Sequence, residues 1–344
     1  MSVEIHRFGA VTLRSGAVLA DAFIRFETHG QLNQERSNVV LVLTWFCATH
    51  VQAGWLIGAD RALDPARLFI IVVNLFGNGQ SSSPSDSSLH GTGAGFPLVS
   101  ILDNVDLQRR LLVERFGIER VALIVGRSMG AQVALQWGAF HPQATKAIIA
   151  IEGSARTTPH NQVFLEAVRL ALMLDPEWRQ GRYHAQPMAG HRLVRTIFDG
   201  WAMSQSFYRE GLHLSPDMPT TRFFLERKEP EMLGDANDIL AQIATWQAAD
   251  ISANPVFGGD LSSALRSIAC RTILMPCETD LYFPPEDSIR AASEIPNAEV
   301  RVIKSIWGHR AGAPGTPRAD VEAIETAVRD TLAASLVHRR EYHS

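Results

Sequence analysis

The sequence predicts an α/β fold in which a mostly parallel central sheet is flanked by helices and interrupted by a helical lid. Over the first half of the chain, apolar runs typical of buried strands alternate with helix-like segments. From about residue 155 to 265 no convincing strand is found, and the segment is rich in Met, Trp and Phe. Strand-like runs then return. We therefore expect a core made of residues 1–154 and 266–344, with residues 155–265 forming the lid.

The strand predictions rest on short apolar runs bounded by turn residues. Residues 68–75 ("LFIIVVNL") are continuously apolar, which is typical of a strand covered on both faces of a parallel sheet. The other predicted strands are residues 22–30, 38–45, 121–126, 146–154, 271–277 and 299–306.

Three helices are predicted in the core. Residues 100–117 place their apolar residues on one helical face, with Ser100 as the N-cap and Gly117 at the C-terminal stop. A small-residue helix begins near residue 130. An amphipathic helix over residues 319–337 closes the chain.

Composition excludes several classes of protein. The 344 residues are 46% apolar and 20% charged, with a net charge of −4 and a pI of about 6.3. Lys and Arg are scattered, so nucleic-acid binding is not expected. The N-terminus lacks the features of a signal peptide, and no apolar run reaches the roughly 18 residues that a membrane span requires. We expect a cytoplasmic protein that contacts neither nucleic acid nor membrane.

Cysteine usage and glycine patterns predict no metal and no cofactor. Three cysteines without a CxxC pair argue against a disulfide framework and against a structural zinc site. They are expected to be small buried hydrophobic residues. The segment "HGTGAG" at residues 90–95 follows no clear strand, so it lacks the context of a dinucleotide-binding motif.

The stretch "LIVGRSMGAQ" at residues 123–132 carries the chemistry. Gly-x-Ser-x-Gly between a buried strand and a helix is the pattern of a nucleophile elbow, a tight turn that holds the serine hydroxyl above the sheet. Gly126 and Gly130 leave room for this turn. Ser128 is therefore the predicted nucleophile; the alternative is a serine in a purely structural turn.

A serine nucleophile requires a base and an acid, and both follow predicted strands. Asp280 lies in the loop after residues 271–277, and His309 lies in the loop after residues 299–306. The carboxyl ends of parallel strands are where such sheets build their sites. The order Ser, Asp, His suits a catalytic triad on an elbow of this kind. Glu278 is the competing acid, and a surface histidine is the alternative for His309.

Backbone amides are predicted to bind the developing oxyanion. One is the amide of Met129, directly after the nucleophile, and the second is the amide of Trp45 or Phe46 in the loop after residues 38–45. The aromatic side chain would also wall the acyl pocket; the alternative is that both aromatics only fill the core. Arg127 is a candidate for binding a substrate carboxylate, or else it forms a salt bridge to a neighbouring loop.

The chain resembles the homoserine O-acetyltransferase-like family of the α/β-hydrolase fold, over nearly its whole length. The resemblance implies Ser128 as nucleophile with Asp280 and His309 as partners, a helical lid, and a homodimer formed mainly through the lid. The segments that carry it are "FETHGQLN", "THVQAGWLIGADRALD", "VNLFGNGQSSSPS", "FPLVSILDNVDLQ", "GRSMGAQVALQW", "DPEWRQGRY", "TDLYFPP" and "WGHRAG".

Departures from the family pattern all fall near the acyl pocket. The transferases usually carry Gly-Gly-Ser-Met-Gly-Gly at the elbow and Leu-Thr-Gly-Asp in the oxyanion loop, where this chain has residues 126–131 ("GRSMGA") and 45–48 ("WFCA"). The ending "GHRAG" replaces their Gly-His-Asp. An intact triad beside a changed pocket favours a hydrolase of a small ester, thioester or amide. The alternatives are an acyl-CoA-dependent O-acyltransferase and a non-catalytic binding module on the same fold.

Overall fold

The computed structural model describes residues 1–86, 95–227 and 234–337, and within them one eight-stranded sheet forms the centre of the molecule. The strand order is β1-β2-β4-β3-β5-β6-β7-β8. The sheet and its flanking helices confirm the predicted fold class. The strands are β1 (Ser2–Thr12), β2 (Val18–His29), β3 (Val39–Leu43), β4 (Phe69–Val73), β5 (Leu123–Arg127), β6 (Ala147–Ile151), β7 (Arg271–Met275) and β8 (Ala298–Val300).

The central strands are parallel and buried on both faces. From β4 through β8 every neighbouring pair is parallel, whereas β1 pairs with β2, and β2 with β4, in antiparallel fashion. All residues of β3, β4, β5 and β6 are buried. This burial explains why these strands are continuously apolar in sequence rather than alternating.

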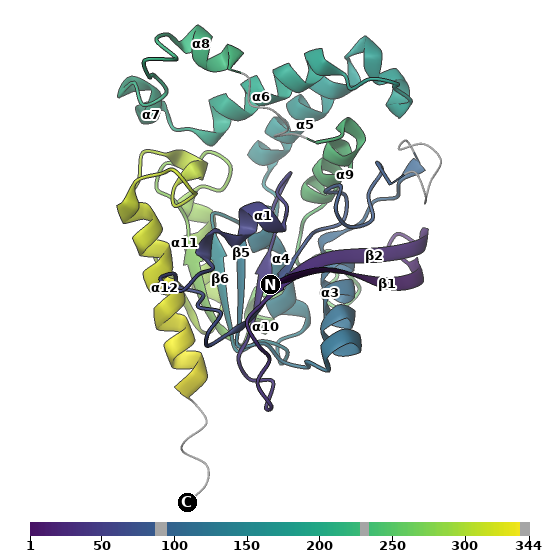
Figure 1. The fold of residues 1–344 in the computed structure, drawn as a ribbon, viewed down its shortest axis with the longest axis vertical. Coiled ribbons are helices and arrows are strands. Elements are labelled where there is room, and N and C mark those ends of the chain that lie inside the picture. The colour runs from purple at the N-terminus through teal and green to yellow at the C-terminus, as the bar shows by residue number, and fades with distance from the viewer. Residues whose placement is uncertain (87–94, 228–233, 338–344) are drawn as a thin grey trace, which may run out of the picture.

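Helices cover both faces of the sheet and extend beyond one end of it (Figure 1). Their bounds are α1 (His50–Ala53), α3 (Ile101–Phe116), α4 (Met129–Phe140), α5 (Pro159–Met173), α6 (Met188–Ala202), α7 (Gln205–Arg209), α8 (Thr221–Glu226), α9 (Ala236–Gln247), α10 (Leu261–Ser267), α11 (Pro285–Glu294) and α12 (Arg318–Val337). Short 3₁₀ helices are η1 (Gly54–Leu56), η3 (Pro176–Gly181) and η4 (Gly308–Arg310).

Two hydrophobic clusters lie on opposite faces of the sheet. Alternate residues of the central strands pack with α3, α4, α10 and α11 on one face and with η1 and α12 on the other. Helix α3 has the predicted caps: the Ser100 side chain accepts a hydrogen bond from the amide of Asp103, and Gly117 adopts φ +62°. The first of these is half of a capping box, and the second is the left-handed conformation that favours glycine at a helix end.

Two strands differ from the sequence prediction. Strand β1 was not expected. It lies at the edge of the sheet, and its largely exposed residues alternate only loosely with half-buried ones. Two register shifts interrupt its pairing with β2. Strand β8 ends at Val300, although residues 299–306 were predicted as a strand. Its neighbour β7 is followed by Pro276, which has no amide hydrogen to donate to the sheet, so only an isolated bridge between Cys277 and Ile303 continues the pairing.

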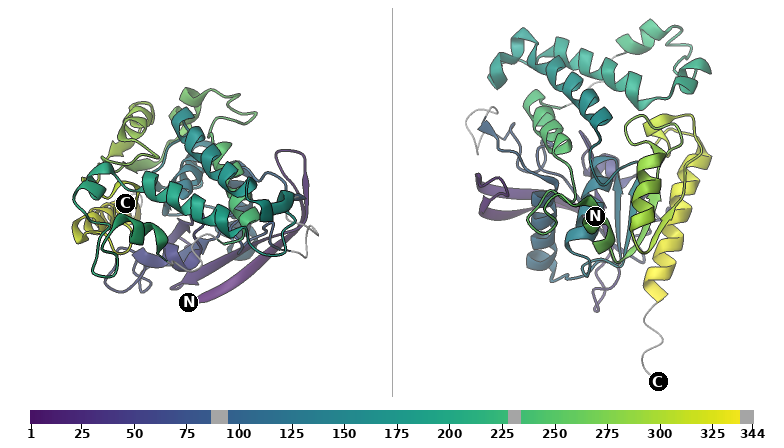
Figure 2. Two further views of the ribbon diagram at one scale, coloured as in Figure 1. Left: turned by 90° about the horizontal axis from the view of Figure 1, so that it is seen from above. Right: turned by 180° about the vertical axis from the view of Figure 1, so that it is seen from behind.

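The segment predicted as a lid lies between β6 and β7. Helices α5, α6, α7 and α8 lie beyond one end of the sheet in both side views (Figure 1 and the right view of Figure 2). Helix α9 packs against α5 and η3. The predicted boundary at residue 265 falls within α10, a helix that packs against α4 and α11 of the core. None of the helices described here is both long and apolar enough to cross a membrane.

Candidate active site

The backbone at Ser128 is held in a conformation that side chains rarely adopt. Ser128 joins β5 to α4 with φ +54° and ψ −126°. Its amide donates a hydrogen bond of 2.8 Å to the carbonyl of Ile151, and its carbonyl accepts one of 2.9 Å from the amide of Ala131. Such strained residues cluster at functional sites, where the surrounding structure holds them in place. The turn therefore has the geometry of a nucleophile elbow.

Two glycines make the turn possible, as the sequence predicted. A Cβ atom on Gly126 would lie 2.1 Å from the carbonyl oxygen of Gly130, and one on Gly130 would lie 2.6 Å from the carbonyl oxygen of Thr44. Both distances are far below van der Waals contact, and both neighbours are backbone atoms. Only glycine fits at either position.

The structure brings Ser128, His309 and Asp280 together in one hydrogen-bonded chain. His309 Nε2 lies 2.8 Å from Ser128 Oγ, and His309 Nδ1 lies 2.8 Å from Asp280 Oδ2. The second Asp280 oxygen accepts hydrogen bonds from the amides of Tyr282 (2.8 Å) and Phe283 (3.2 Å). All three members of the chain are buried, whereas the competing acid at position 278 is exposed. This geometry favours Asp280 as the acid.

Burial favours the neutral form of the catalytic histidine candidate, His309. The loss of solvent lowers the pKa of His309 below its usual value of 6.5, because a charged imidazolium is poorly stabilised there. Asp280 opposes this shift, while the positive charges of Arg127 and Arg310 add to it. A neutral imidazole can accept the proton of the serine hydroxyl.

The predicted oxyanion loop forms a tight turn from Trp45 to Ala48, closed by a hydrogen bond of 3.0 Å from the amide of Ala48 to the carbonyl of Trp45. Cys47 occupies this turn with φ +56°, the left-handed region that favours glycine. Its amide donates a 2.7 Å hydrogen bond to Oε1 of Gln242 on α9. Among the described residues, the amides of Trp45, Phe46 and Met129 have no hydrogen-bond acceptor. The absence of a protein acceptor for these three amides is consistent with the predicted oxyanion site.

Arg127 is turned away from solvent. Its guanidinium donates to one carboxylate oxygen of Glu152, from Nε at 2.9 Å and from Nη2 at 2.6 Å. Nη2 also donates to the carbonyl oxygen of His309. Arg127 and Glu152 are 7% and 0% exposed. Of the two roles considered for Arg127, this geometry favours the salt bridge over the binding of a substrate carboxylate.

An aromatic cluster encloses the histidine. The rings of Tyr282 and Phe283 lie 4.7 and 5.5 Å from that of His309, measured between centroids. Phe46, in the oxyanion loop, stacks on Phe198 of α6 at 5.4 Å. Core loops and the predicted lid thus meet over the site in one aromatic cluster, which consists of Phe46, Phe164, Phe198, Trp201, Trp246, Tyr282 and Phe283.

Trp45 and Phe46 have different surroundings. Phe46 belongs to the aromatic cluster, in keeping with a wall of the acyl pocket. Trp45 instead packs on the other face of the sheet, and its ring centroid lies 5.8 Å from the guanidinium carbon of Arg127.

Two residues of the site were not anticipated from the sequence. Glu152 directly follows β6, and a carboxylate at the end of a buried strand was a signal that could have been used. Gln242 carries no such signal, because it lies 195 residues from the Cys47 amide that it binds. Its role depends entirely on how α9 packs.

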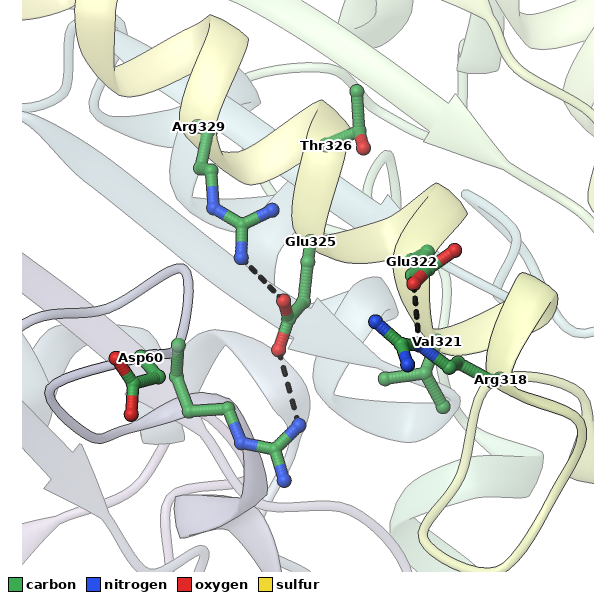
Figure 3. A pocket seen from close by; sticks show the side chains of 8 residues that line it. Asp60, Arg318, Val321, Glu322, Glu325, Thr326 and Arg329 are labelled. Carbon is green, nitrogen blue, oxygen red and sulfur yellow. Dashed lines mark hydrogen bonds and ion pairs between the residues drawn. The ribbon is translucent and has the colours of Figure 1, made fainter.

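A separate surface hollow of about 480 Å³ contains no triad residue (Figure 3). It lies between the segment around Arg61 and helix α12, and its charges largely pair with one another. Glu325 binds both Arg61 and Arg329 (Figure 3). The "HGTGAG" segment, apart from its last residue, lies outside the described residues.

Comparisons with known proteins place this chain among enzymes. The sequence model of the family described as "alpha/beta hydrolase fold" matches residues 38–309. An ethyl acetate hydrolase from Pseudomonas veronii is 35% identical, over 96% of this chain and 95% of its own. A homoserine O-succinyltransferase from Methylibium petroleiphilum is 33% identical, over 80% and 79%. Among solved structures, an acetylester hydrolase from Corynebacterium glutamicum has a TM-score of 0.89 and 31% identity, with 96% of each chain covered.

Proposed function

Since this chain belongs to the α/β-hydrolase fold family, in the group that includes both acetyl ester hydrolases and homoserine O-acyltransferases, we propose that it hydrolyses small esters, acetyl esters in particular. The observation that carries the proposal is the hydrogen-bonded chain from Ser128 through His309 to Asp280. A buried serine held this way serves as a nucleophile toward an acyl carbon.

The proposed reaction has two halves. His309 Nε2 takes the proton of Ser128 Oγ as the oxygen attacks the ester carbonyl, and the amides of Met129 and of Trp45 or Phe46 bind the resulting oxyanion. The C–O bond to the alcohol then breaks, and His309 returns the proton to the departing oxygen. Water repeats the sequence on the acyl-serine, which releases a carboxylic acid and free Ser128.

The surroundings of the triad support a small, apolar acyl group. The aromatic cluster offers ring faces and edges but few polar partners, which suits a short hydrocarbon chain. The oxyanion turn reads Trp-Phe-Cys-Ala where the transferases usually have Leu-Thr-Gly-Asp. These changes favour water over a bound alcohol as acceptor. The runner-up remains an acyl-CoA-dependent O-acyltransferase, which the similarity to the homoserine enzymes supports.

The test compares the two reactions directly. Purified protein is assayed with ethyl acetate and with p-nitrophenyl esters of increasing chain length, and separately with acetyl-CoA in the presence and absence of homoserine. We expect cleavage of acetyl esters, faster than of long-chain esters and unaffected by homoserine. Rapid thiol release from acetyl-CoA that depends on homoserine, with O-acetylhomoserine found by mass spectrometry, would overturn the proposal in favour of the transferase.

The catalytic roles are tested with paired variants. Asp280→Asn removes the charge beside His309, and we expect kcat to fall by about 10⁴, as for a triad whose histidine tautomer is no longer fixed. Glu278→Gln makes the same chemical change on the exposed neighbour and is the control, with near wild-type turnover. Ser128→Ala should abolish both turnover and labelling by a fluorophosphonate. Labelling of a different serine, or greater damage from Glu278→Gln, would refute these assignments.

A further inference from the structure

A buried salt bridge between Arg127 and Glu152 lies next to the main chain of the catalytic histidine. Arg127 ends β5, and Glu152 follows the neighbouring strand β6. Both nitrogens of the guanidinium that face Glu152 bind the same carboxylate oxygen. The other carboxylate oxygen has no hydrogen-bond partner among the described residues. The pair is thus a fixed feature of the sheet, immediately before the nucleophile in the chain.

The same guanidinium reaches the loop that carries His309. Its Nη2 donates to the main-chain carbonyl of His309, while the imidazole of that residue is bound on one side by Asp280 and on the other by Ser128. Residues 308–310 form a single 3₁₀ turn that starts at Gly308 with φ +61°. Backbone hydrogen bonds from Arg310 to Trp307 and from Ala311 to Gly308 close the turn, and Thr279 accepts from the Gly308 amide. Arg127 adds the donor to the carbonyl of His309 itself.

A third contact joins Arg127 to the oxyanion loop. The Trp45 ring lies 5.8 Å from the guanidinium carbon, within the range of a cation–π contact. One side chain therefore touches the residues that carry the base and a predicted oxyanion donor, and its own backbone adjoins the nucleophile. Its Nε and Nη2 donate to Glu152 and to the His309 carbonyl, so the bonded edge of the guanidinium faces the protein rather than an acyl group.

A buried ion pair adds little net stability to a fold, because removing two charges from water costs free energy. Replacing both members of such a pair by apolar residues is often neutral or stabilising, whereas removing one member is strongly destabilising. Burial also raises the pKa of Glu152 well above its usual value, an effect that Arg127 opposes. Stability alone therefore does not explain why Arg127 and Glu152 are buried here. A role in positioning the catalytic histidine does explain it.

We propose that Arg127, held in place by Glu152, is a positioning residue that fixes the main chain of His309 so that the imidazole meets Ser128 Oγ. This inference rests on the proposed serine-dependent function. Arg127 acts through the histidine and contacts no substrate atom. Its loss should therefore lower kcat while KM for a neutral ester stays unchanged.

The decisive variant is Arg127→Met combined with Glu152→Leu, which removes both charges and leaves no unpaired one. We expect this double variant to fold with a Tm near that of the wild type. Its kcat for ethyl acetate should fall by roughly 10²-fold, the effect of a misplaced reacting group, with KM unchanged. The rate of fluorophosphonate labelling at Ser128 should fall in parallel.

Two further variants complete the design. Arg61→Met combined with Glu325→Leu removes another arginine–glutamate contact with a buried carboxylate, away from the site (Figure 3), and should keep the wild-type kcat. Arg127→Lys keeps the positive charge beside Glu152 but lacks the planar set of N–H donors with which the guanidinium binds two partners at once. It should fold stably and label at a rate between those of the double variant and the wild type.

The outcomes separate this inference from the proposed function. If the wild type cleaves no acetyl ester, the proposed substrate class is wrong, yet the labelling rate still tests Arg127. Wild-type labelling and kcat in the double variant and in Arg127→Lys would overturn the positioning role. So would a change confined to KM for esters that bear a carboxylate, which would assign Arg127 to substrate binding instead.

Discussion

At the scale of single residues, the site depends on groups whose environment differs sharply from water. His309 is the main example, because burial lowers its pKa while Asp280 acts in the opposite direction. Arg127 and Arg310 also face it and disfavour its protonation. The net effect is a pKa below that of an exposed histidine, which favours the neutral imidazole.

This balance predicts how activity depends on pH. The proposed mechanism needs neutral His309, so kcat/KM should fall as the pH drops through its pKa in the free enzyme. Because that pKa is lowered, the midpoint of the acid limb should lie below pH 6.5, the ordinary histidine value. A profile of p-nitrophenyl acetate hydrolysis measures it. A midpoint above pH 6.5 would contradict the stated direction.

The same shift affects stability. Between the lowered pKa and about 6.5, the unfolded chain binds a proton at His309 and the folded chain does not. The contribution of this residue to folding is therefore complete above that window and is lost as the pH falls through it.

Single residues also show what a sequence can reveal about a site. Ser128, Asp280 and His309 each follow a predicted strand in a recognisable order, so local patterns were enough to identify them as candidates. The resemblance to the homoserine O-acetyltransferase-like family is confirmed by relatives more than 30% identical. For Glu152 the sequence offers a signal, a carboxylate at the end of a buried strand, but not its partner. The pairing with Arg127 also requires the alignment of β5 with β6.

At the scale of elements, the oxyanion loop and helix α9 form one unit. Cys47 adopts a backbone conformation that favours glycine, and the hydrogen bond from its amide to Gln242 helps to hold it there. Helix α9 belongs to the predicted lid. The arrangement of the oxyanion donors therefore depends on a helix far away in the sequence.

Gln242→Met tests this dependence. The change keeps the side-chain size and removes the acceptor for the Cys47 amide, so we expect kcat to fall, by up to the roughly 10²–10³-fold that loss of an oxyanion donor causes. Gln136→Met is the matched control, because Gln136 is equally buried but its amide donates only a long hydrogen bond of 3.4 Å to the Ile251 carbonyl. Equal turnover in the two variants would show that α9 does not set the loop geometry.

Elements also differ in how well sequence predicts them. Strands β3, β4, β5 and β6 were predictable because both faces of each are buried and every residue is apolar or small, except the terminal Arg127 of β5. The edge strand β1 has no such signature, since largely exposed residues belong equally to a loop. The early end of β8 follows from Pro276 in the adjacent chain segment, which no local pattern in β8 could indicate.

At the scale of the whole molecule, the predicted lid exposes several large apolar side chains. Helices α5 and α6, with the residue that ends α5, expose large hydrophobic side chains, of which Leu174 is 75% exposed. Exposed apolar patches on a folded domain commonly mark an interface. The others are Val163, Leu170, Met188 and Leu193.

We therefore predict a homodimer formed through this surface. Light scattering on the wild type should give twice the mass of the 37.9 kDa chain. Leu174→Glu combined with Leu193→Glu should shift the mass to that of a monomer, because two charges would be buried in the interface. Val18→Glu, at an exposed valine on β2, is the control and should leave the dimer intact. A wild-type monomer over a wide concentration range would refute the prediction.

The long sequence separation within the triad has a kinetic consequence. Ser128 and His309 are 181 residues apart, and the oxyanion turn meets α9 across 195 residues. Contacts of such high order form late, because the entropy of closing large loops must be overcome before they contribute any stability. During refolding, helical secondary structure can therefore return while the serine still lacks its base. If the proposed triad is the catalytic machinery, we expect newly synthesised chains to be inactive toward esters until the segments after β7 and β8, which carry Asp280 and His309, are in place.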